Sequence, residues 1–185
     1  MTEEVISDLG REMEQTLAKF RRELARTRSG RASTALLDGV MVDYYGTKTP
    51  LNQLAGITVP EPRLLLLQPY DKGALHEIER SIQQSDLGLT PVNDGKVIRI
   101  PIPELTAERR RDLVKHLHKV AEEYRVSVRN HRRDAIDMLK ALEKDKEITE
   151  DDLHRAQEKV QQATNEYIER VDKVLKAKEE EILEV

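Results

Sequence analysis

The fold is decided by residues 105–185, which read LTAERRRDLVKHLHKVAEEYRVSVRNHRRDAIDMLKALEKDKEITEDDLHRAQEKVQQATNEYIERVDKVLKAKEEEILEV and contain neither proline nor glycine. Proline removes a hydrogen bond from a helix interior and clashes with the preceding turn, and glycine costs about 1 kcal/mol there. A stretch without either can therefore form continuous helix. Residues 1–30 also lack proline, whereas all seven prolines lie between Pro50 and Pro103. The chain thus reads as a helical part with a compact segment inserted into it.

Apolar residues at spacings of three and four predict three amphipathic helices. The first runs from about Thr2 or Glu3 to about Arg28, the second begins at Thr106, and the third begins at Thr149. Each of the two threonine hydroxyls can cap the first turn of its helix. The three stripes are Ile6, Leu9, Met13, Leu17, Phe20 and Leu24; then Leu113, Leu117, Val120, Tyr124, Val128, His131, Ala135, Met138 and Leu142; then Leu153, Ala156, Val160, Ala163, Tyr167, Val171, Val174 and Ile182. Such stripes can be buried only against one another, so residues 1–30 and 105–185 should form an elongated three-helix bundle domain.

Residues 31–104 change to a strand-like pattern. Strands are expected near residues 40–44, 57–59, 64–67 and 97–102, with one helix over residues 74–85. This segment should be a small inserted α/β domain, which makes the fold class α+β. The chain enters the insert at Gly30-Arg31 and leaves it at Pro103-Glu104, and two adjacent crossings predict a hinge.

Composition excludes several classes of protein. The 185 residues are 38% apolar and 36% charged, which describes a soluble chain, and no apolar run approaches the roughly 20 residues that span a membrane. The N-terminus lacks the pattern of a signal peptide, so a cytoplasmic location is expected. Cysteine is absent, and the sequence contains no glycine-rich phosphate loop, His-Glu-x-x-His pair or nucleophile elbow. We therefore expect no enzyme, no metal and no cofactor.

Basic residues concentrate at the start of the second helix. Residues 105–133 hold nine Lys or Arg against four Asp or Glu, whereas residues 134–185 hold nine against sixteen. Arg125, Arg129 and Arg132 fall within roughly 60° of one another on a helical wheel. Arg111 and His118 extend the same line, and Lys115 and Arg133 flank it.

This arginine stripe is placed about 120° from the apolar stripe, facing solvent and nearly without carboxylates. A solvated charged face is the ordinary interpretation of such a pattern. Rows of arginine without interleaved acids nevertheless match the bidentate geometry and repeat of a phosphate backbone, so the sequence favours RNA or DNA as the partner.

Other polar residues have structural interpretations. His131 lies on the apolar stripe and should be a hydrogen-bonded core residue, and Asp151-Asp152 should be first-turn acids of the third helix. Tyr44-Tyr45 could stack on bases, although Tyr44 continues an alternating strand and one of the pair should pack in the core.

Five blocks along the chain resemble one known family. They are Arg26-Thr-Arg-Ser-Gly-Arg-Ala-Ser33, Tyr44-Tyr-Gly-Thr-Lys-Thr-Pro-Leu51, Ser85-Asp-Leu-Gly-Leu89, Leu105-Thr-Ala-Glu-Arg-Arg-Arg-Asp-Leu113 and Val128-Arg-Asn-His-Arg-Arg-Asp-Ala135. Together they resemble the bacterial ribosome recycling factors over essentially all 185 residues.

The resemblance implies a bundle domain and a small α/β domain arranged as an L with the outline of a transfer RNA. It also implies a monomer that binds the 70S ribosome after termination, mainly through the 23S RNA of the large subunit. Elongation factor G, using GTP, then acts on the bound factor so that the ribosome leaves the messenger RNA and its subunits part. The factor itself hydrolyses nothing.

Carried over to this sequence, the family's ribosome-contacting arginines are Arg110, Arg129 and Arg132, with Arg28 and Arg31 assisting. Arg110 falls at the edge of the apolar stripe on the wheel, so we expect it to fray outward or to pair with an acid. The family commonly has threonine at Ser29, an aliphatic residue at His131 and glutamate at Ala107, and these differences affect only local packing and the helix start.

Two alternatives stay open on the residues alone. A helical scaffold or co-chaperone would use the charged helices to bind a protein, and would show no salt-dependent affinity for RNA. An RNA-modifying enzyme would need a catalytic constellation that the sequence does not contain.

Overall fold

The computed structural model describes residues 1–184 and divides into two compact units. The bundle unit comprises Met1–Leu24 and Arg111–Leu183, and the insert unit is formed mainly by Ala25–Arg110. The end of the first helix and the start of the second thus group with the insert. The predicted domain boundaries, after residues 30 and 104, remain a prediction.

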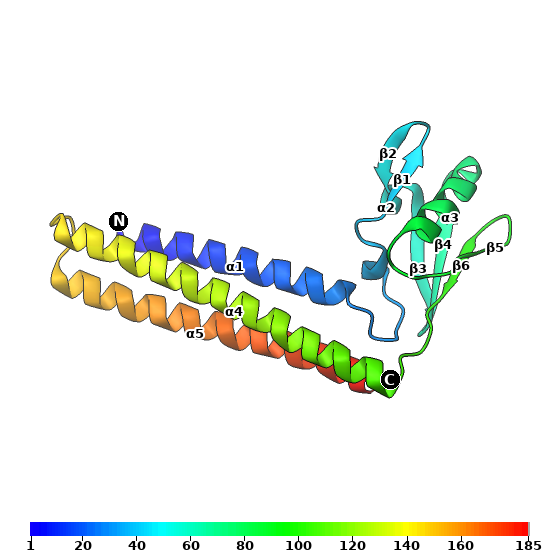
Figure 1. Cartoon of the computed structure of the whole chain (residues 1–185). Coiled ribbons are helices and arrows are strands. Elements are labelled where there is room, and N and C mark those ends of the chain that lie inside the picture. Colours follow the sequence, from blue (N-terminus) through cyan, green and yellow to red (C-terminus); the bar gives the residue numbers. More distant parts are fainter. Residues whose placement is uncertain (185) are drawn as a thin grey trace. The chain divides into compact units, whose positions relative to one another are not determined.

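Three helices form the bundle unit, α1 (Thr2–Arg26), α4 (Ala107–Lys144) and α5 (Glu150–Leu183), and they run side by side (Figure 1). At 1.5 Å per residue the 38 residues of α4 extend about 57 Å. Two apolar clusters fill the space between the helices, one around Phe20 and Leu117 and one around Met13 and Val128. The predicted three-helix bundle is confirmed.

Both predicted helix caps are present. The amide of Arg109 donates to the Thr106 hydroxyl at 3.2 Å. At α5 the amide of Asp152 donates to the Thr149 hydroxyl at 3.1 Å, while the amide of Thr149 donates to the Asp152 carboxylate at 3.1 Å. This reciprocal capping box leaves Asp152 with the structural role expected from its place in the first turn.

Two details of the helix predictions are wrong. Helix α1 ends at Arg26 rather than Arg28, because the chain already leaves helical geometry ahead of Gly30, whose φ is 83°. Met138 is 60% exposed, and Leu139 is buried in its place. The buried face of α4 continues from Ala135 by a step of four, which selects Leu139 rather than Met138.

The insert unit contains a four-stranded antiparallel sheet in the order β3-β4-β6-β5. Its strands are β3 (Ala55–Glu61), β4 (Leu64–Pro69), β5 (Val92–Asn93) and β6 (Ile98–Pro101). A separate hairpin joins β1 (Met41–Tyr44) to β2 (Thr47–Pro50), and helix α3 (Leu75–Gln84) packs on β1. Short helices complete the unit: η1 (Thr34–Leu37), α2 (Leu51–Leu54) and η2 (Lys72–Ala74).

One apolar core holds the insert together. In β4 and β6, Leu65, Leu67, Ile98 and Ile100 are fully buried, and they meet Ile78 and Ile82 of α3. The expected strands and the expected helix are present with ends shifted by a few residues. Strands β2 and β5 were not predicted, since they are short and partly polar.

Candidate nucleic-acid interface

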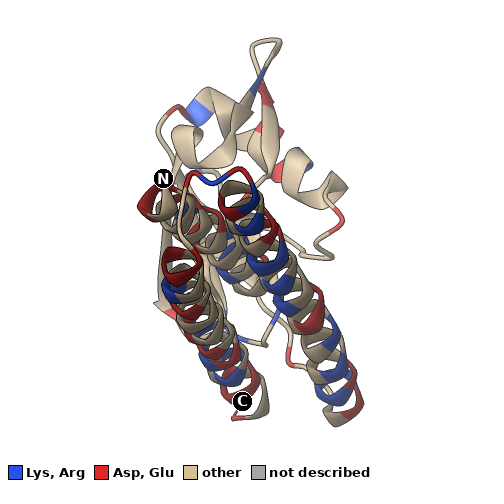
Figure 2. Cartoon of the chain, turned by 90° about the vertical axis from the view of Figure 1, so that its left-hand side faces the viewer, with Lys and Arg blue, Asp and Glu red and all other residues tan. Residues whose placement is uncertain are grey.

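The predicted arginine stripe runs along α4 of the bundle unit. Its basic residues at intervals of seven are Arg111, His118, Arg125 and Arg132, with Arg129 between the last two. Figure 2 shows basic residues along this helix, interleaved with acids. What each side chain can bind depends on what it already contacts.

The stripe lies against α5 at three successive levels. His118 Nε2 lies 3.1 Å from Glu179 Oε2, Arg125 Nη2 lies 2.7 Å from Asp172 Oδ1, and Arg132 Nη1 donates to Gln161 Oε1 at 3.2 Å. The expectation of an open face nearly free of carboxylates is therefore wrong. The acids that meet the stripe come from α5, which a wheel of α4 alone does not include, and from Glu122 of α4 itself.

Arg125 is held by acids on both sides. Its Nε donates to Asp172 at 2.8 Å and its Nη1 to Glu122 at 3.1 Å, and only 19% of its side chain is exposed. Burial opposes the charge of the guanidinium, but the hydrogen bonds to Asp172 and Glu122 outweigh burial and raise the pKa of Arg125. This arginine joins α4 to α5 and has little charge left for an outside phosphate.

Arg129 and Arg132 are more available. Arg129 is 45% exposed, and its one side-chain hydrogen bond to residues 1–184 runs from Nη1 to Glu122 Oε1 at 3.0 Å. The hydrogen bonds from Arg129 and then Arg125 lower the pKa of Glu122, so this carboxylate stays ionised between the two arginines. Arg132 bonds to a neutral amide and forms no ion pair within residues 1–184.

Arg111 and Arg133 extend this basic surface. Both are exposed, and neither forms an ion pair in the part of the chain that the structure describes. With Arg129 and Arg132 they form what we call the available arginine set. A phosphate backbone would find guanidinium groups along α4 that can still donate, separated by the structural Arg125.

The remaining predicted arginines lie in the insert unit. Arg31 is exposed, and Arg28 Nη1 lies 3.5 Å from the carbonyl oxygen of Leu87. The Nε atoms of Arg28 and Arg110 are buried without a hydrogen-bond partner among the described residues. Contrary to the sequence prediction, Arg110 forms no ion pair with an acid of the described chain. It also does not fray, because its amide bonds to the Thr106 carbonyl at 3.0 Å in the first turn of α4.

His131 is confirmed as a hydrogen-bonded residue of the bundle. Its Nε2 lies 3.0 Å from the Thr16 hydroxyl, and its Nδ1 lies 3.1 Å from Glu12 Oε2, so the ring connects α4 to α1. The Thr16 hydroxyl also contacts the backbone carbonyl oxygen of Glu12 at 3.0 Å, and each ring nitrogen of His131 has a polar partner. A polar ring at this edge of the core is thereby satisfied.

Tyr44 and Tyr45 have different surroundings. Tyr44 packs against the insert core and donates to Asp71 at 2.8 Å, as expected for one member of the pair. Tyr45 is 81% exposed. Its φ of 48° places it with Gly46 in the tight turn between β1 and β2.

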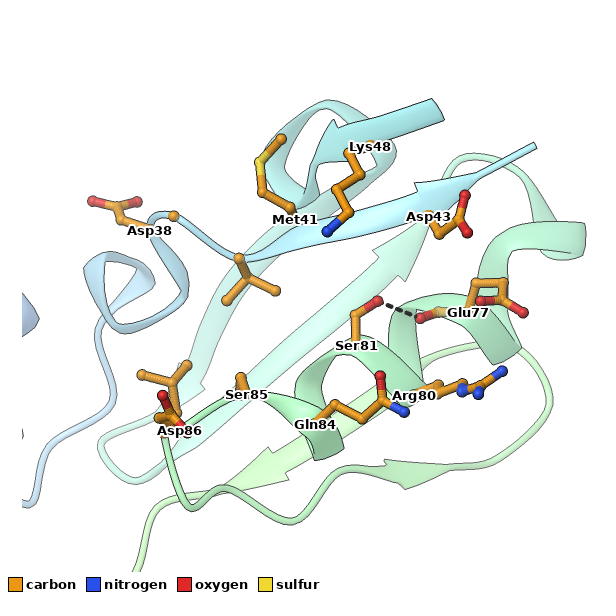
Figure 3. A pocket seen from close by; sticks show the side chains of 13 residues that line it. Asp38, Met41, Asp43, Lys48, Glu77, Arg80, Ser81, Gln84, Ser85 and Asp86 are labelled. Carbon is orange, nitrogen blue, oxygen red and sulfur yellow. Dashed lines mark hydrogen bonds between the residues drawn. The ribbon is translucent and has the colours of Figure 1, made fainter. Parts of the chain in front are cut away.

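A pocket between β1 and α3 gives no support to an enzyme. It is an open hollow of about 590 Å³ between β1 and α3, lined by acids such as Asp43 and Glu77 and by Lys48 and Arg80 (Figure 3). Its Ser81 hydroxyl donates to the backbone carbonyl of Glu77 at 2.8 Å, a bond within α3. None of the described residues that line the pocket is a histidine, so this serine lacks the usual general base beside it.

Residues 20–183 match the family model described as ribosome recycling factor. The chain belongs to the ribosome recycling factor family. The ribosome-recycling factors of Halalkalibacterium halodurans and Bacillus subtilis are 58% and 55% identical to it over 185 residues, each covering all of both chains. The resemblance found in the five sequence blocks is thereby confirmed, and this family is not catalytic.

Solved structures of the family have the same fold. A solution structure of ribosome recycling factor is 42% identical, with a TM-score of 0.80, and covers 100% of this chain and 98% of its own. A second structure, 44% identical with a TM-score of 0.69 and 99% coverage of each chain, belongs to a set described as models for the T. thermophilus ribosome recycling factor and the E. coli elongation factor G bound to the E. coli post-termination complex. Within residues 1–184 no helix is long and apolar enough to cross a membrane.

Sequence reasoning missed the residues that decide which arginines are available. Asp172 and Gln161 lie 47 and 29 positions from the arginines that they contact. The sequence contains one relevant signal, the short link between the second and third helices. Such a link predicts that the two helices pack antiparallel, so that residues of α5 lie beside α4 along its length.

Proposed function

We propose that this chain is a cytoplasmic translation factor that binds the ribosome after termination. With elongation factor G and GTP, it promotes release of the ribosome from messenger RNA and its splitting into subunits for reuse. The observation that carries this proposal is family membership over the whole chain, together with a neighbour of the same fold described with elongation factor G on a post-termination complex. The chain acts as a monomer and needs no cofactor of its own.

The contact with the ribosome is made by the available arginine set, Arg111, Arg129, Arg132 and Arg133, on the 23S RNA of the large subunit. Guanidinium groups bind phosphate oxygens through two parallel hydrogen bonds, and a rigid helix fixes the spacing between them. Contacts of this kind position a protein without reading sequence. Arg28, Arg31 and Arg110 assist from the insert unit, where the two buried Nε atoms leave the guanidinium ends as the groups to donate.

The hinge lies in the two chain crossings around Gly30-Arg31 and Pro103-Glu104. The amide of Ala32 donates to the Pro62 carbonyl at 2.7 Å, and that of Ile102 donates to the Arg63 carbonyl at 2.8 Å. The Arg63 side chain also pairs with Glu104 at 2.7 Å. These bonds anchor both crossings to the turn between β3 and β4. They support a hinge because only the few residues between each anchor and the neighbouring helix end are left to bend.

A splitting assay tests the proposed function. Post-termination 70S complexes are mixed with elongation factor G and GTP, with and without the purified protein, and subunit separation is followed by light scattering. We expect rapid splitting only when protein, elongation factor and GTP are all present. Splitting at the same rate without the protein would contradict it and return the scaffold alternative to consideration.

A further inference from the structure

Along the contact between α4 and α5, which we call the seam, a basic residue of α4 meets a polar residue of α5 at three levels, seven residues of α4 apart. The α5 partner is an acid at the first two levels and an amide at the third. Moving along α4 from His118 to Arg125 corresponds to moving back along α5 from Glu179 to Asp172. The same step takes α4 to Arg132 and α5 to Asn165. Two levels of the seam therefore place a carboxylate against the basic residue, and the third places an amide there.

The amides at the third level are hydrogen-bonded to each other. Gln161 Oε1 accepts from Arg132 Nη1 at 3.2 Å, and Gln161 Nε2 donates to Asn165 Oδ1 at 2.8 Å. An arginine can only donate, so its contact requires the oxygen of Gln161, and the Asn165 oxygen requires the nitrogen. The two contacts together set the orientation of the Gln161 amide.

An amide and a carboxylate hold an arginine with different electrostatic results. A carboxylate at 2.7 Å largely cancels the guanidinium charge seen from outside, as at Arg125, whereas an amide carries no net charge. The side chain of Arg132 is thus fixed in place with its charge intact. A neutral amide partner therefore suits an arginine whose charge is used to bind a phosphate rather than to pair with an acid of the neighbouring helix.

We propose that Gln161, oriented by Asn165, is a positioning residue for the ribosome contact of Arg132. It holds the guanidinium at the edge of the seam without neutralising it. This inference rests on the proposed function, because it takes Arg132 to be a phosphate contact.

The test replaces Gln161 with glutamate, which has the same size and places a carboxylate against Arg132. Gln162→Glu is the matched control, since the neighbouring exposed residue gives the same change in net charge away from the seam. Binding to isolated large subunits is measured by co-sedimentation between about 50 and 200 mM salt, the range over which phosphate contacts weaken strongly. We expect Gln161→Glu to weaken binding about fivefold relative to Gln162→Glu, and its salt slope to be shallower by about one ion.

Thermal unfolding separates this effect from misfolding. The new ion pair between Arg132 and the introduced carboxylate should leave the unfolding midpoint unchanged or raise it, so weaker binding is expected without any loss of stability. A Gln161→Leu variant, which keeps the charge of Arg132 but removes its hydrogen bond, should bind about twofold more weakly with an unchanged salt slope.

Equal affinities of Gln161→Glu and Gln162→Glu, with Arg132→Ala still weakening binding, would overturn this inference and leave the proposed function standing. Absence of saturable binding by the unaltered protein would overturn both.

Discussion

Arg125 and Arg132 lie seven residues apart on the same face of α4, yet different groups surround their guanidinium ends. Arg125 is mostly buried between Asp172 and Glu122, while Arg132 meets an amide. A helix presents both side chains in the same direction, so the difference comes entirely from the groups around them. The neighbouring groups therefore decide whether an arginine of α4 is held within the bundle or keeps its charge available for a ligand.

Arg125→Ala should lower the free energy of unfolding by about 1–2 kcal/mol, since Asp172 loses its guanidinium partner, Glu122 loses one of its two, and a mostly buried stem leaves a gap. Arg132→Ala should change stability by less than about 0.5 kcal/mol, as expected for a surface position, and weaken large-subunit binding more. Urea unfolding and co-sedimentation of both variants check the pair. The reverse order of effects would show that the available set has been assigned wrongly.

Asp94 provides a prediction on pH in the turn between β5 and β6. The amides of Val97 and then Lys96, with the guanidinium of Arg99, lower the pKa of Asp94 to about 2. A depressed pKa stabilises the folded state above the unfolded value near 4, and this contribution is lost as the pH falls towards 2. Asp94→Asn should therefore unfold at a lower temperature than the parent at pH 7, and the gap should close by about pH 2. A gap that stays constant over this range in thermal scans would contradict the assignment.

The roles that could be predicted from sequence are those set by a residue's position within its own helix. The caps at Thr106 and Thr149 and the core role of His131 follow from position within one helix. The partners of Arg125, Arg129 and Arg132 depend on side-chain packing across the seam, and the true setting of Arg110 depends on burial at the start of α4. The residue pattern within α4 alone predicts neither these partners nor this burial.

At the scale of elements, the connection between α4 and α5 ends one helix and caps the next within a few residues. Lys146 has a φ of 60°, and its amide bonds to the Glu143 carbonyl while that of Glu147 bonds to the Leu142 carbonyl, both at 2.9 Å. This is a Schellman motif with lysine in the left-handed position that glycine occupies most readily.

Lys146→Gly should raise the free energy of unfolding by about 0.5–1 kcal/mol, because glycine adopts this conformation without a Cβ clash. Lys144→Gly, in the last turn of α4, should lower the free energy of unfolding by a similar amount. Denaturant unfolding of the two variants measures both. A loss of stability in Lys146→Gly would show that the lysine side chain contributes more than its backbone conformation costs.

Helices with a long apolar stripe could be predicted from sequence, whereas the shortest strands could not. Helices α1, α4 and α5 each carry a stripe many turns long, so their existence is insensitive to single residues. Strand β5 has two residues and β2 has four exposed or half-buried ones, and both form only because a neighbouring strand offers hydrogen bonds. Their formation depends on tertiary context that a window of sequence does not include.

For the whole molecule, the proposed function assigns binding and movement to different parts of the chain. The bundle unit supplies the arginines proposed to hold the ribosome, and the crossings at Gly30-Arg31 and Pro103-Glu104 supply the proposed hinge. Changes in the linker should therefore affect splitting more than affinity.

Gly30→Ala tests this separation, because a φ of 83° is strained for any residue with a Cβ. We expect large-subunit affinity within about twofold of the parent and splitting slowed several-fold, since the strain of about 1–2 kcal/mol falls on the linker. Gly10→Ala is the matched control: it lies inside α1, where an added Cβ meets nothing within 4 Å. The control should keep both activities and gain stability. Splitting by Gly30→Ala at the parental rate would remove this residue from the hinge.

We propose that the available arginines of α4 bind ribosomal RNA. The most direct measurement is co-sedimentation of the protein with vacant 70S ribosomes and isolated large subunits across a salt series, beside the double variant Arg129→Ala, Arg132→Ala. We predict saturable binding that weakens with salt, and for the double variant a weaker affinity with a salt slope reduced by about two ions. Binding by the double variant with the parental affinity and salt slope would contradict the claim.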